Sequence, residues 1–218
     1  RYCMKIKLAM QKFWYNFIRF PKYVLFHPFD GYDELKREKK GKVSVAVIFM
    51  LLFILLRIYK YLGEGFVINP RNPLALNTFD EFFSVALLIF LFTVGNWSIT
   101  TLLEGKGTYR EIFIVTGYSL FPIVIIGFPA VFISNYLTLD EIGLYSLAMS
   151  AAYFLTGVML FMGILNIHEY GLLKTIFTFI LTVVAMAFMA FLGLLFFDLI
   201  QQFLSFVKSV YQELRLRY

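Results

Sequence analysis

Apolar residues occur in five long runs that are separated by short polar segments. A helix needs roughly 20 consecutive apolar residues to cross the hydrocarbon core of a bilayer. Each run is about that long, so each predicts a membrane-spanning helix, and the chain is expected to be an all-α, polytopic membrane protein with a five-helix bundle in residues 43–199. The predicted spans are residues 43–62, 82–103, 112–137, 142–167 and 175–197.

Residues 1–42 form a basic amphipathic segment ahead of the first span. Apolar residues recur three and four positions apart, with basic residues between them, which is typical of a helix at a membrane surface. A helix packed on a partner protein is the alternative. Eleven Lys and Arg residues and four Asp and Glu residues precede Val43. Because this positive charge stops directly at an apolar span, it favours anionic lipid over nucleic acid as the partner. The helix pattern comprises Ile6, Met10, Phe13, Trp14, Phe17 and Ile18, with Lys5, Lys12 and Arg19 between them.

Residues 200–218 continue the last span as an amphipathic pattern. Apolar side chains recur at helical spacing, and Gln201, Gln202, Lys208 and Gln212 occupy the other side. We therefore expect an amphipathic helix that either continues the fifth span or bends along the membrane surface. Its candidate partner-binding residues are Phe203, Val207, Val210, Tyr211, Leu214 and Arg215.

Positive charge predicts the orientation of the spans, because translocated loops avoid Lys and Arg. With the N-terminus inside, fourteen of the 20 Lys and Arg residues lie inside and six outside. Five spans then place the N-terminus in the cytoplasm and the C-terminus at the exterior of the cell membrane.

Composition and residue types exclude several kinds of function. The chain is 60% hydrophobic and 16% charged, whereas a soluble domain is about 45–50% apolar and about 25% charged. Cys3 is the single cysteine, so neither an internal disulfide nor a thiol metal cluster can form. The middles of the spans lack Asp, Glu, Lys and Arg, which argues against an ion-coupled carrier. We expect no metal and no cofactor.

Two short motifs resemble catalytic or phosphate-binding signatures, and neither is complete. Residues 104–108, EGKGT, lack the glycine that a phosphate-binding loop places five residues earlier, so a tight turn is expected in which Gly105 and Gly107 supply positive φ angles. Residues 117–121, GYSLF, lack the final glycine of a nucleophile elbow around Ser119. Pro122 instead predicts a kinked helix. We therefore expect the protein not to be an enzyme.

Three stretches together resemble the Yip family of small multispanning membrane proteins (Ypt/Rab-interacting proteins and their prokaryotic relatives). They are HPFDGY at residues 27–32, GKGTYRE at residues 105–111 and GYSLFP at residues 117–122. The resemblance implies a five-span, N-inside protein with an organising or accessory role, and it brings no catalytic residues. The residues that carry the family motif are Pro28, Gly105, Gly107, Gly117, Tyr118, Ser119 and Pro122.

The resemblance is closest to bacterial members of the family, through residues 96–122, 168–175 and the tail YQELRLR. Some of these are encoded beside carbohydrate ABC-transporter genes. The expected function is therefore an accessory or scaffold subunit of a membrane complex, with transporter permeases and a solute-binding protein as candidate partners. The alternative is an autonomous channel, permease or membrane-shaping protein. An Asp-Leu-Tyr-Gly-Pro-type motif, which the eukaryotic branch carries before its first span, is missing, which argues against a Rab-type partner.

Overall fold

A computed structural model describes residues 10–11, 14–69, 71–72 and 75–217, with the side chain of residue 217 left out. All regular structure within these ranges is helical, which confirms the predicted all-α class. Five helical stretches are long and apolar enough to cross a membrane, as the sequence predicts. The positions of Cys3, Lys5, Ile6, Lys12 and Phe13, on which part of the N-terminal prediction depends, lie outside the described residues.

The helices follow one another with short connections. Two short elements and a helix precede the first span: a π-helical turn Tyr15–Arg19, α2 Phe20–Phe26 and α3 Pro28–Arg37. The spans are then α4 Val43–Gly63, α5 Thr78–Leu102, α6 Tyr109–Ser119 with α7 Phe121–Ser134, α8 Ile142–His168 (after a short 3-10 turn, Leu139–Glu141) and α9 Leu172–Arg217.

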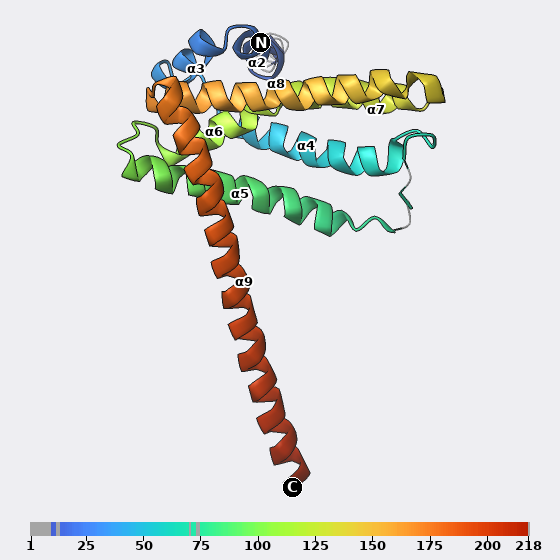
Figure 1. The fold of residues 1–218 in the computed structure, drawn as a ribbon, viewed down its shortest axis with the longest axis vertical. Helices are drawn as coiled ribbons and strands as arrows, with labels where there is room; N and C mark the ends of the chain where they lie inside the picture. The colour runs from blue at the N-terminus through green and yellow to red at the C-terminus, as the bar shows by residue number, and fades with distance from the viewer. Residues whose placement is uncertain (1–9, 12–13, 70, 73–74, 218) are drawn as a thin grey trace, which may run out of the picture.

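Four of the five spans, α4, α5, α6–α7 and α8, lie side by side, and α9 crosses them (Figure 1). α6 packs on α4 and α8, and α7 packs on the same two helices, so this span is the most enclosed of the five. α2 and α3 form a separate layer over α8. The end of the bundle where α3 meets the α5–α6 and α8–α9 connections is called the basic end below.

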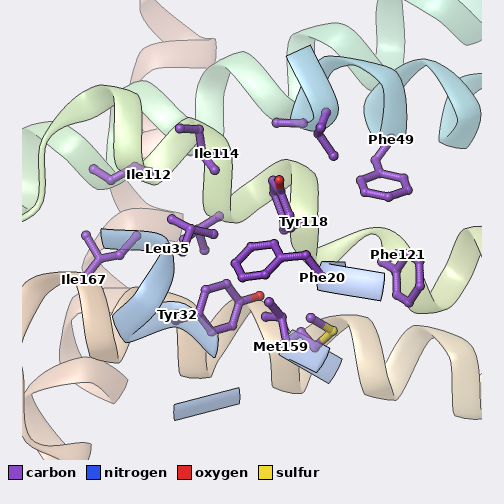
Figure 2. Close-up of a cluster of buried hydrophobic side chains, with 14 of the residues drawn as sticks. Phe20, Tyr32, Leu35, Phe49, Ile112, Ile114, Tyr118, Phe121, Met159 and Ile167 are labelled. Carbon is purple, nitrogen blue, oxygen red and sulfur yellow. The ribbon is translucent and has the colours of Figure 1, made fainter. Parts of the chain in front are cut away.

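The core beneath the basic end is aromatic and aliphatic, and Tyr118 lies within it (Figure 2). Its ring makes edge-on contacts with Phe20, whose centroid is 5.9 Å away, and with Phe49 at 6.0 Å. Its hydroxyl accepts from the backbone N–H of Lys42 at 3.4 Å. The N-terminal layer is therefore packed on the third span through Phe20 of α2.

Helix α9 differs from the other spans because it leaves the bundle. It runs for 46 residues without a break and crosses α5, extending away from the other helices (Figure 1). Every residue in 190–216 is exposed. Of the two arrangements that the sequence allows for the tail, the structure has the straight continuation of the fifth span.

Candidate functional site

The α5–α6 turn at the basic end is built by local capping. α5 ends at Leu102, and α6 begins at Tyr109 after Thr108. The backbone N–H of Thr108 donates to the Glu111 carboxylate at 2.8 Å, and the N–H of Glu111 donates to the Thr108 hydroxyl at 3.4 Å. This reciprocal capping box satisfies two backbone donors that a helix start would otherwise leave free. The sequence TYRE therefore fixes where the third span begins.

The two glycines of this turn are required by close packing, and the expectation that they supply positive φ angles is wrong. No described glycine has a positive φ; the residue with φ of 57° in this turn is Glu104. A Cβ atom on Gly105 would lie 2.5 Å from Nδ1 of His168 and from the hydroxyl of Tyr170. A Cβ on Gly107 would lie 2.7 Å from Cε1 of the same histidine. Only glycine lets the α8–α9 connection approach this closely.

His168 and Tyr170 hold the two connections together. The N–H of Gly107 donates to Nδ1 of His168 at 3.2 Å, and the Tyr170 ring stacks on the imidazole with centroids 5.2 Å apart. The Tyr170 hydroxyl donates to the carbonyl of Leu103 at 3.2 Å. Burial raises the pKa of this phenol, so it stays a donor at every physiological pH.

Glu169 joins three separate parts of the chain. Its backbone is left-handed, with φ of 56°. Its carboxylate accepts from Lys106 at 2.6 Å and from Lys36 of α3 at 3.0 Å. These two ammonium groups, with Lys106 the larger cause, lower the pKa of Glu169 to about 2. Lys36 also donates to the carbonyl of Ile167 at 2.7 Å, which caps the end of α8. We call Lys36, Lys106 and Glu169 the basic-end clamp.

The motif GYSLFP, residues 117–122, which follows this turn, has a structural role. α6 ends at Ser119 and α7 begins at Phe121, with Pro122 in its first turn, so the predicted kink is present. The Ser119 hydroxyl is buried and donates to the carbonyl of Thr116 at 2.7 Å. His168 instead faces Gly107, so no hydrogen bond joins it to the serine. The structure therefore does not form a serine–histidine pair from these residues.

A family model described as the Yip1 domain matches residues 22–195. The chain belongs to the Yip1 domain family. It is thus an integral membrane protein of that family, and the match contains every motif residue named above. No curated protein and no solved structure matches it. The matched range ends within α9, so residues 196–218 lie outside the match.

The remaining family-motif residues of this Yip1 domain have packing roles. Pro28 occupies the first turn of α3, where a missing N–H costs nothing. Gly117 lies against α4, because a Cβ there would be 2.5 Å from the Cα of Ala46 and 2.8 Å from its carbonyl oxygen. α4 and α6 consequently touch through their backbones.

The opposite end of the Yip1 domain carries a polar cluster that the sequence analysis missed. The carboxylate of Glu64 accepts from the buried hydroxyl of Tyr145 on α8, and Arg57 pairs with Glu81 through two nitrogens at 3.0 and 2.9 Å. No sequence motif contains these residues together, because they come from three different helices and a helix end. The surrounding cavity has a volume of about 190 Å³, and it is lined by Arg57, Lys60, Tyr61, Arg71, Glu81 and Tyr153.

The predicted partner-binding residues all lie on the exposed part of α9, beyond the Yip1 domain match. The exposed fractions of the five apolar and aromatic members range from 40% for Val210 to 66% for Phe203 and Tyr211. They are Phe203, Val207, Val210, Tyr211, Leu214 and Arg215. Within the described part of the chain, no three His, Cys, Asp or Glu residues are grouped so that they could hold a metal ion.

Proposed function

We propose that this Yip1-domain protein is a non-enzymatic accessory or scaffold subunit of a membrane complex. The observation that carries the proposal is the exposed end of α9, residues 190–216, which extends beyond the helical bundle. An amphipathic helix that its own bundle does not cover can bind a partner by laying its apolar face into a groove of that partner. In addition, the polar groups of Ser119, in the family motif, and of Glu169, in the α8–α9 connection, are engaged in holding the fold together.

The partner proposed from the family resemblance is a carbohydrate ABC importer, through its permeases or its solute-binding protein. Support for this finer statement is the resemblance of residues 96–122 and 168–175 to bacterial members of the family. The same reasoning from Lys and Arg gives the proposed orientation in the cell membrane, with the basic end in the cytoplasm and the tail of α9 outside.

Purification of the tagged chain from its native membrane in a gentle detergent tests the proposal. Co-eluting proteins are identified by mass spectrometry and quantified against a chain that stops after Phe197. We expect a stoichiometric partner that the shortened chain loses. Equal partner content in both preparations, or none in either, contradicts a docking role for the tail.

Two controls separate the other functions. Vesicles that hold only this protein are expected to show no flux of sugars or ions; measurable flux would favour the channel or permease alternative. Ser119→Ala is expected to leave every phenotype of the strain intact, since its hydroxyl is bonded to a backbone carbonyl. A selective loss of function with a normal amount of folded protein would instead indicate catalysis.

A further inference from the structure

The cavity of about 190 Å³ at the end of the bundle opposite the basic end, called the far cavity below, is lined mainly by charged and phenolic side chains. They come from the end of α4, the loop that follows it, the start of α5 and the first half of α8 (Figure 1). The lining residues are Arg57, Lys60, Tyr61, Arg71, Glu81 and Tyr153. Three of these six residues are basic and one is acidic, so the lining is positive.

Ion pairs account for two of the three cations. Nε and Nη2 of Arg57 reach the same oxygen of Glu81, at 3.0 and 2.9 Å. The ammonium group of Lys60 lies 4.0 Å from the carboxylate of Glu64, just outside the lining. Arg71 forms no ion pair with any residue that the structure describes. Three cations and two carboxylates therefore leave one positive charge unmatched.

The loop after α4 holds Arg71 in place. The backbone N–H of Arg71 donates to Oδ1 of Asn69 at 3.1 Å, and the amide of Asn69 donates to the carbonyl of Tyr61 at 2.9 Å. The guanidinium carbon of Arg71 lies 5.6 Å from the centroid of the Tyr61 ring, a cation–π contact. This contact uses the face of the guanidinium group, and its N–H donors bond to no described side chain or carbonyl. They are therefore free to bind an anion at the cavity.

The position of these cations in a membrane protein also favours an anion. In the proposed orientation six Lys and Arg residues lie outside, where positive charge is under-represented. Three of the six line this one cavity. Arg57 and Lys60 belong to α4, a helix that spans the membrane. Charged residues in such helices are costly and usually mark a binding site or pathway.

We propose that the far cavity binds a phosphodiester group. A phosphodiester carries one negative charge, which balances the unmatched cation, whereas a phosphomonoester carries about −1.5 to −2. The planar guanidinium of Arg71 can donate two parallel N–H bonds to phosphate oxygens. The cavity has the volume that about six water molecules occupy in the liquid, which is enough for the five heavy atoms of a phosphate group.

Two sources can supply this group, the headgroup of a phospholipid and a soluble diester. α4 ends at Gly63, beside the cavity. A spanning helix ends in the headgroup region of the bilayer, where the phosphodiesters of phospholipids are the abundant anions. A carboxylate has the same charge but not this abundance. The site is independent of the accessory role proposed above, because no residue of α9 lines the cavity.

Native mass spectrometry of the full chain, titrated with phosphatidylglycerol in detergent, tests the site. Arg71→Gln removes an exposed side chain that is in no described ion pair, so the fold should persist. We expect the dissociation constant of the first bound lipid to rise about tenfold, which corresponds to about 1.4 kcal/mol. Arg71→Lys keeps the charge without the planar fork and should give an intermediate value. Lys208→Gln, which removes the same charge from the exposed tail, is the matched control and should leave the constant unchanged.

Competitors identify the ligand chemistry. Diacylglycerol, which lacks phosphate, and oleate, a carboxylate, should not displace the first lipid; displacement by either would overturn the phosphodiester assignment. Glycerophosphoglycerol, the headgroup without acyl chains, separates the two sources: competition at the same concentration as the lipid indicates a soluble diester, and its absence indicates a bilayer lipid. Equal weakening by Arg71→Gln and Lys208→Gln, or no weakening by Arg71→Gln with an unchanged melting temperature, would overturn the site.

Discussion

The third and fifth spans are both strongly apolar, yet they have opposite surroundings. In the apolar window of α6–α7, 72% of residues are buried within the protein, against 6% in that of α9. Apolar composition therefore shows that a helix can enter the membrane, not whether it faces protein or lipid. Small residues do not separate the two spans either: Gly117 lies against the backbone of α4, whereas no atom of the described residues is within 4 Å of a Cβ built on Gly193.

The largest expected effect on stability in this comparison comes from adding a side chain at Gly117. A methyl group there meets the backbone of Ala46, which cannot move aside as a flexible side chain can. Overpacking of this kind costs about 1–3 kcal/mol. Gly117→Ala should lower the free energy of unfolding by that amount, as measured by thermal or denaturant unfolding in detergent. The matched control is Gly157→Ala, where nothing lies within 4 Å; similar losses in both variants would show that the contact is not decisive.

A smaller effect is expected where α9 still belongs to the bundle. Asn96 is buried and donates to Thr182 across the α5–α9 contact. Interhelical hydrogen bonds in membrane proteins contribute about 0.6–2 kcal/mol. Asn96→Ala should therefore destabilise the fold by about 1 kcal/mol and expose residues near Thr182 to hydrogen exchange. Ser98→Ala, on the exposed side of α5, serves as the control. No change in exchange at α9 would mean that packing alone holds it.

The basic-end clamp predicts a dependence on pH. The folded-state pKa of Glu169 is lowered from 4.5 to about 2, so its stabilisation is complete above pH 4.5 and is lost as the pH falls towards 2. The difference in stability between the native chain and Glu169→Gln should be constant from pH 7 to 5 and shrink below that. Unfolding curves over this range measure it. Glu213→Gln on the exposed tail is the control, and a difference that grows at low pH would contradict the clamp.

The smallest effect on folding is expected in the tail. Val210→Glu changes a residue of α9 that is 40% exposed and lies beyond the bundle. In detergent, its unfolding should match that of the native chain within about 0.5 kcal/mol. A large loss of monomer stability would show that the tail packs on its own fold.

The sequence was sufficient for features that depend on neighbouring residues. The five apolar runs and the kink at Pro122 are local patterns, whereas the capping box that starts α6 at Tyr109, three residues before the predicted span, was missed. It was insufficient where the role of a residue depends on a contact with a residue far away in the sequence. Gly105 was expected to serve a turn, but its neighbours His168 and Tyr170 are more than sixty residues away. The pair of Glu64 with Tyr145 has the same origin, since no spacing links two residues 81 positions apart.

The unbroken course of α9 makes it a mechanical lever as well as a surface. At 1.5 Å per residue it is about 69 Å long, and its contact with α5 near Thr182 lies close to one end. The arm beyond that contact is about 50 Å long, so a rotation of about 5° at α5 displaces its tip by roughly 4 Å. A small adjustment inside the membrane domain is thereby enlarged at the far end of the chain.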